Sequence, residues 1–155
     1  MPVSTNLSRA VTLAIAIAFV LLCAGPTAAD LNPAALAYKL PKDINWVDQG
    51  NGSMRAIIAG DPNKPGLYVL LNRWKAHNMS RPHFHPNDRF ITVLSGTWWV
   101  GTGSKYDPDS TVPLPAGTVV THFAKQIHYD GAKDEDAVLE IVGIGPATNT
   151  PAETK

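Results

Sequence analysis

The feature that most constrains the fold is a series of short β-forming runs separated by residues that favour turns. Seven such runs cover residues 44–48, 54–59, 67–74, 89–94, 97–101, 118–123 and 137–144. Gly, Pro, Asn and Asp fill the gaps between them, as at residues 49–52 and 60–66. No long helical pattern and no internal repeat is present. Many short strands with this spacing are typical of a β-sandwich or barrel, so the sequence predicts an all-β domain.

Two histidines lie just before the run at residues 89–94. His83 and His85 are two positions apart, and residues i and i+2 of an extended chain point to the same side. The two imidazoles can therefore approach one point in space, and neutral imidazole is a common ligand for Fe, Zn, Cu and Ni. The alternative is a chance pair on a solvated strand.

The same alternation of side chains extends into the strand that follows the two histidines. If the chain stays extended across residues 86–88, Arg89, Ile91 and Val93 share the side of the two histidines, while Phe90 faces the other way. Ile91 and Val93 suit a barrel interior. Arg89 is therefore expected to point inward, next to the histidines, unless it pairs with a neighbouring acid.

The histidine segment and a later segment resemble the two motifs of the cupin superfamily. The first motif reads Gly-(x)5-His-x-His-(x)3,4-Glu-(x)6-Gly, and the second reads Gly-(x)5-Pro-x-Gly-(x)2-His-(x)3-Asn. Here His83 and His85 are followed by three residues, Arg89, six residues and Gly96, and Gly117 precedes His128 at the spacing of the second motif. The resemblance covers about residues 52–145. It implies a double-stranded β-helix, the RmlC-like jelly-roll barrel of cupins.

The chain departs from both motifs at several positions. Other residues stand where the motifs have Glu, Pro, Gly, Asn and the opening Gly, namely Arg89, Phe123, Lys125, Ala132 and either Ala76 or His77. A guanidinium only donates hydrogen bonds and stays charged, so a site with three histidines and a glutamate is excluded. A three-histidine site remains.

The resemblance therefore implies a divalent metal held by His83, His85 and His128. Iron is the favoured metal, with Mn, Ni, Zn and Cu as alternatives. Three-histidine sites occur in cupin dioxygenases that cleave diketones or oxidise thiols. Arg89 is the candidate catalytic residue, since it can bind an anionic substrate or steady a bound oxygen species. Next to this site, His122 is expected to be an ordinary strand residue, and His77 is expected to have no role.

The N-terminal segment has the features of a secretory signal peptide. Arg9 precedes an uncharged apolar run over residues 10–25, and small residues follow it up to Ala29. We therefore expect cleavage after residue 29, a periplasmic or secreted protein and no membrane anchor afterwards. The remaining expected divisions are a lead-in at residues 30–43, a cupin barrel at 44–145 and a disordered tail at 146–155.

Composition narrows the function further. Cleavage would remove Cys23, the single cysteine of the chain, which excludes disulfides and cysteine-based metal sites from the mature protein. The 13 basic and 13 acidic residues form no basic cluster, so we expect no nucleic-acid partner. A small-molecule ligand is expected, and cupins often form homodimers.

Three functions stay open at this point. The first is an exported metal-dependent oxidoreductase of the dioxygenase type. The second is a non-catalytic cupin that binds a small molecule or a metal, and the third is a structural barrel without chemistry. The sequence does not decide whether the protein is an enzyme, and no residue names a substrate.

Overall fold

The structure is a computed structural model that describes residues 31–154. The chain divides into two units after residue 38, and the second unit, from residue 39 on, holds the sheets. The expected signal peptide at residues 1–29 lies outside the described residues. Within residues 31–154, no helix has the length and apolar character that crossing a membrane requires.

The second unit is built from short strands, with two single 3-10 turns at Pro41–Asp43 and Pro108–Ser110. The strands are β1 (Val47–Asp48), β2 (Ser53–Ala59), β3 (Gly66–Trp74), β4 (Asn78–Met79), β5 (His83–Phe84), β6 (Arg89–Ser95), β7 (Thr97–Thr102), β8 (Val112–Pro115), β9 (Val119–His122), β10 (His128–Ala132), β11 (Ala137–Gly145) and β12 (Thr150–Pro151).

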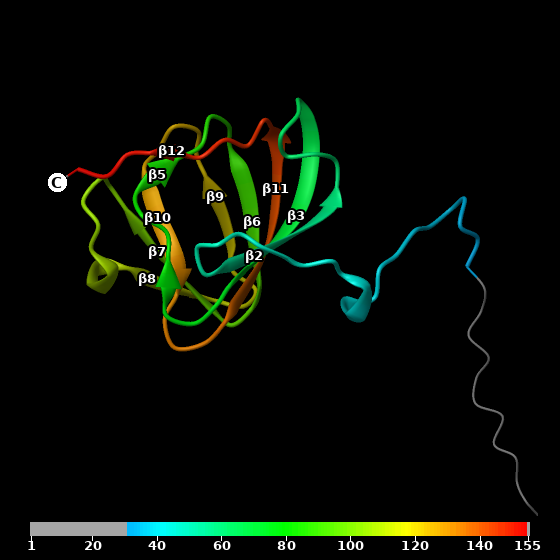
Figure 1. The fold of residues 1–155 in the computed structure, drawn as a ribbon, viewed down its shortest axis with the longest axis horizontal. Helices are drawn as coiled ribbons and strands as arrows, with labels where there is room; N and C mark the ends of the chain where they lie inside the picture. The colour runs from blue at the N-terminus through cyan, green and yellow to red at the C-terminus, as the bar shows by residue number, and fades with distance from the viewer. Residues whose placement is uncertain (1–30, 155) are drawn as a thin grey trace, which may run out of the picture. The chain divides into compact units, whose positions relative to one another are not determined.

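The strands form two sheets whose pairs are all antiparallel. One sheet has the order β1-β2-β3-β11-β6-β9, and the other has the order β12-β5-β10-β7-β8 with β4 paired to β10. Figure 1 shows the sheets facing each other as the two walls of a barrel. The predicted double-stranded β-helix of the cupin type is confirmed.

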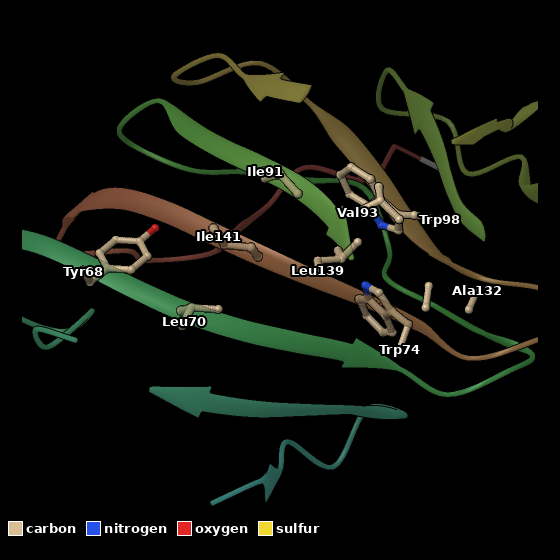
Figure 2. Close-up of a cluster of buried hydrophobic side chains, with 10 residues drawn as sticks. Tyr68, Leu70, Trp74, Ile91, Val93, Trp98, Ala132, Leu139 and Ile141 are labelled. Carbon is tan, nitrogen blue, oxygen red and sulfur yellow. The ribbon is translucent and has the colours of Figure 1, made fainter. Parts of the chain in front are cut away.

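Alternation along the strands sorts side chains between the interior and the outer surface. In β3 the buried residues are Tyr68, Leu70, Asn72 and Trp74, at every second position. Rows of inward residues continue from strand to strand, because Leu70 pairs with Ile141 and Ile141 pairs with Ile91. Figure 2 shows how these side chains, together with Val93, Trp98, Ala132 and Leu139, fill the barrel.

All seven predicted runs contain a strand, but five further strands were missed: the two-residue strands β4, β5 and β12, and the longer strands β8 and β10. β8 contains Pro113 and Pro115, which cannot donate to a ladder, and it is tolerated because it forms the edge of its sheet. β10 contains Asp130 and Gly131, which disfavour strands, yet every residue in it is buried. A Cβ at Gly131 would lie 2.2 Å from the carbonyl oxygen of Asn78, so the close approach of β4 requires glycine there.

The prediction of a disordered tail is wrong for residues 146–154. Thr150 pairs with Phe84 through β12 and β5, and the amide of Ala152 donates to the carbonyl of Pro82 at 2.9 Å. Glu153 forms an ion pair with Arg81. Figure 1 shows this segment running across one end of the barrel to reach β5. Its polar composition suggested disorder, but its backbone hydrogen bonds with the β5 segment order it.

Candidate metal and ligand site

Three histidines predicted as metal ligands meet inside the barrel. His83 and His128 are cross-strand partners on β5 and β10, and His85 follows β5 by one residue. Their rings lie 4.5 to 5.3 Å apart between centroids, and one potential ligand atom from each lies within 4.8 Å of the others. All three side chains are buried. The geometric part of the prediction, convergence of these three residues, is therefore observed.

Each of the three imidazoles is held in the same way. The Nδ1 atoms of His83, His85 and His128 lie 2.8, 2.8 and 3.0 Å from the backbone carbonyls of residues 81, 148 and 126. A carbonyl only accepts, so each Nδ1 carries the proton in the neutral ring. The lone pair is then on Nε2 in all three, and the Nε2 of His85 is buried without a hydrogen-bond partner.

Arg89 points inward, as the parity of the strand predicted. Its Nη2 donates to Nδ1 of His122 at 3.1 Å and lies 3.4 Å from Nε2 of His128. Its Nε is buried without a partner. The guanidinium therefore lies against the lone pair that His128 would offer to a metal.

Asp130 is the carboxylate nearest to this cluster, and the sequence analysis missed it. One of its oxygens accepts from the indole nitrogens of Trp74 at 2.9 Å and Trp98 at 3.2 Å. The other lies 4.0 Å from Nε2 of His128. Figure 2 shows the two tryptophans within the hydrophobic cluster, with their ring nitrogens turned toward each other. A buried carboxylate held by two neutral donors can balance the nearby charge of Arg89.

His122 also belongs to the cluster, although the sequence favoured an ordinary strand residue. It is buried, and its ring centroid lies 3.8 Å from that of His128. Because its Nδ1 accepts from Arg89, the proton of the neutral ring is on Nε2, which has no partner. In this arrangement, His122 supports Arg89 and offers no lone pair to a metal, although His122, His128 and Asp130 are close enough to form a second group.

Burial keeps several of these imidazoles neutral. It lowers the pKa of His85 to about 2, with the charge of Arg89 as the next cause. It lowers the pKa of His122 to about 2, with further contributions from His128 and Arg89. The pKa of His128 is lowered to about 4 by burial, and Asp130 opposes this shift. Burial also lowers the pKa of Arg89, while Asp130 acts to raise it.

The histidines open into a cavity of about 170 Å³ inside the barrel. Its walls include His83 and His85 from the β5 segment and, from the other sheet, Arg55, Tyr68 and Arg89. Ala147 and Asn149 from the C-terminal segment line it as well. The cavity is smaller than a drug-sized pocket of about 300 Å³ or more, so it suits a small ligand.

The donor set fits a divalent metal in one respect and opposes it in another. Three neutral imidazoles with lone pairs on Nε2, each held by a carbonyl at Nδ1, match how metal-bound histidines are usually held. Arg89 opposes binding, since it contacts one of the three lone pairs and repels a dication. His77 lies outside this group, exposed in a loop, as expected from the sequence.

Comparison with known proteins identifies the fold. No protein-family model and no curated protein matches the chain. Among solved structures, a polyketide cyclase, RemF from Streptomyces resistomycificus, is 13% identical with a TM-score of 0.63, covering 77% of this chain and 87% of that chain. A cupin-2 domain from Rhodospirillum rubrum is 12% identical with a TM-score of 0.58, covering 77% and 81%. A double-stranded β-helix protein from Klebsiella pneumoniae is 18% identical with a TM-score of 0.57, covering 76% and 97%.

Proposed function

We propose that this chain, which has the cupin fold, binds a divalent metal through His83, His85 and His128 and uses that site on a small molecule. The observation that carries the proposal is the shared arrangement of the three rings. All three have Nδ1 bonded to a backbone carbonyl, which leaves three Nε2 lone pairs in one buried cluster.

Iron bound to three histidines supplies open coordination positions for O2 and a chelating substrate, which is the chemistry of a non-haem dioxygenase. The chain's own residues would orient the substrate. Arg89 presents a guanidinium beside the cluster and can hold an anionic group there. The three histidines are buried, and the lower dielectric there strengthens such an interaction.

The test begins with metal binding by the purified protein after removal of metal. Calorimetric titration with Fe(II), Mn(II) and Zn(II) should show one site per chain in the wild type and none in His85→Ala. His77→Asn is the matched control, because it removes an exposed histidine outside the cluster. Equal binding by His85→Ala and wild type would end the three-histidine proposal. O2 uptake by the iron-loaded protein with diketone and thiol panels then tests the dioxygenase reaction.

A second candidate is a cupin that binds a small molecule without catalysis. The observation that favours it is the contact between Arg89 and His128, because a guanidinium can replace the positive charge that a metal would bring. Under this alternative, the wild type binds no divalent metal at micromolar concentration, while a small anion still binds in the cavity.

Export and dimerisation remain predictions. N-terminal sequencing of exported protein should find a chain that starts near Asp30, in the periplasm or outside the cell. The outer face of the sheet carries exposed apolar residues, including Leu67, Phe90 and Ile144, which supports a homodimer. Light scattering that shows a monomer at all concentrations would contradict the dimer.

A further inference from the structure

The cavity carries an unequal number of positive and negative side chains. Of the residues that line it, Arg55 and Arg89 are cationic and Asp130 alone is acidic. One guanidinium charge in the cavity therefore has no partner of opposite sign among its walls.

Arg55 is the guanidinium without a partner. It projects from β2, and its Nε is buried without a hydrogen bond. Within residues 31–154, no carboxylate lies within 4.0 Å of it. Burial lowers its pKa, which is the expected effect of removing a guanidinium from water without compensation.

Asp130 does not compensate the charge of Arg55. Its carboxylate is held by the indoles of Trp74 and Trp98 and lies beside His128. Its charge acts to raise the pKa of Arg89, whereas the pKa of Arg55 is raised only by Tyr68, which also acts on Arg89. A partly buried guanidinium whose Nε has no hydrogen-bond partner is costly, so its retention points to a ligand that supplies the missing negative charge.

Polar groups accompany Arg55 on the inner face of the sheet. Arg55 pairs in register with Asn72 across β2 and β3, and both side chains line the cavity. Farther along the same face, Tyr68, Gly143 and Arg89 form one cross-strand row over β3, β11 and β6. Because a Cβ at Gly143 would lie 2.6 Å from the hydroxyl of Tyr68, glycine lets that hydroxyl extend over β11 toward the side of Arg89.

We propose that Arg55 binds a small carboxylate in this cavity, with Asn72 and the Tyr68 hydroxyl as further donors, and that Arg89, farther along the same sheet, contributes a second guanidinium. The planar fork of a guanidinium matches a carboxylate with two parallel hydrogen bonds. A cavity of about 170 Å³ suits a molecule of a few carbon atoms. That the histidine cluster then acts on this carboxylate rests on the proposed function, whereas its binding by Arg55 does not.

The experiment uses the metal-free full chain with malonate, acetate and inorganic phosphate as probes. Binding is followed by calorimetry and by the NMR signals of the arginine Nε–H groups. Malonate should shift the Arg55 signal, and Arg55→Gln should weaken malonate binding about tenfold or more, since it removes a charge-assisted bidentate contact. The malonate affinity of Arg55→Lys should lie between those of wild type and Arg55→Gln, because lysine keeps the charge and loses the planar fork of the guanidinium.

Arg73→Gln is the matched control. Arg73 lies on the neighbouring strand β3 but on its outer side, over the ring of Trp46, so its loss removes the same net charge without changing the cavity. Its malonate affinity should equal that of wild type. Equal binding by Arg55→Gln and wild type overturns the inference, and tighter binding of phosphate than of both carboxylates overturns the ligand class.

A parallel zinc titration separates this inference from the proposed function. If zinc does not bind the wild type while malonate binding depends on Arg55, the metal proposal fails and the carboxylate site stands. If zinc binds through the histidines and malonate affinity is unchanged in Arg55→Gln, the metal proposal stands and the carboxylate site fails.

Discussion

The guanidinium of Arg89 lies 3.4 Å from Nε2 of His128, so a cation of the chain itself contacts one of the three lone pairs that a metal would need. Arg89 stands where the cupin motif has a glutamate, and the change reverses the charge at that position. The histidines keep the arrangement of a metal site, while the neighbouring charge opposes it.

Replacing this cation should therefore strengthen metal binding. Arg89→Glu removes the repulsion and adds a carboxylate at the motif position, so its affinity for Zn(II) should rise by about tenfold or more over wild type. Calorimetry on the metal-free proteins measures the change. Arg73→Glu, a charge reversal outside the cavity, should leave the affinity near that of wild type. Equal affinities in Arg89→Glu and wild type would show that Arg89 does not oppose metal binding.

The buried histidines predict how stability depends on pH. Burial lowers the pKa values of His85 and His122 to about 2 and that of His128 to about 4, from the ordinary imidazole value of 6.5. Between the folded and unfolded pKa values, the unfolded chain binds more protons. The stabilisation that comes from keeping these rings neutral is therefore complete above pH 6.5, and it is lost as the pH falls from 6.5 toward 4 and below.

Between pH 6.5 and pH 5.5, each of these three histidines should remove about 1 kcal/mol from the free energy of unfolding. Urea denaturation of the metal-free protein at several pH values measures this slope. His122→Gln should lose less stability than wild type over the same interval, because one of the three titrating groups is absent. A stability that stays constant from pH 7 to pH 5 would contradict the neutral, buried state of these rings.

The carboxylate of Asp130 should be important for folding. Asp130→Ala would leave two indole N–H groups without their acceptor and Arg89 without its nearest negative charge. We expect the free energy of unfolding to fall by about 3 kcal/mol or more. Asp109→Asn, an exposed change, should be nearly neutral in the same urea titration. A loss below about 1 kcal/mol in Asp130→Ala would show that Asp130 does not compensate Arg89.

The C-terminal segment should support the metal site. Deleting residues 147–155 removes the carbonyl of Thr148 that accepts from Nδ1 of His85, and loss of such a partner typically weakens metal binding about 10- to 100-fold. Deleting only residues 153–155 removes the ion pair with Arg81 and keeps Thr148, so metal binding should be retained. Equal zinc affinity in both deletions would contradict the role given to Thr148.

Replacing Lys125 by glycine should stabilise the protein. Lys125 stands where the second cupin motif has glycine, and its φ is 62°, a left-handed conformation that costs a residue with a Cβ about 1 kcal/mol. Lys125→Gly should therefore raise the free energy of unfolding by up to about 1 kcal/mol, with part of the gain offset by the entropy of glycine in the unfolded chain. Thermal and urea unfolding measure it, and a lower stability would contradict the strain.

Local patterns predicted the parts of the structure that local physics decides. The alternation of Arg89, Ile91 and Val93 placed an arginine inside the barrel, and the two-residue spacing of His83 and His85 placed both rings on one side. Motif spacing then selected His128. Each of these inferences needed only strand geometry or a fixed spacing.

The missed residues became visible only through long-range pairing. Asp130 accepts from Trp74, 56 positions away in the chain, and from Trp98, 32 positions away, so no local pattern marked it. Arg55 gave one signal that could have been used, since a charge in the apolar run at residues 54–59 is unusual. Its inward direction depended on a register that the sequence did not determine.

The contact between His85 and Thr148 spans 63 positions of the chain. During synthesis, His83 and His85 emerge long before Thr148, whose carbonyl orients the ring of His85. Until residues 147–151 are made and have paired with β5, the ring of His85 lacks the carbonyl that fixes its tautomer. Orientation of the His85 ring is thus tied to the pairing of β12 with β5, the strand pair that the chain completes last.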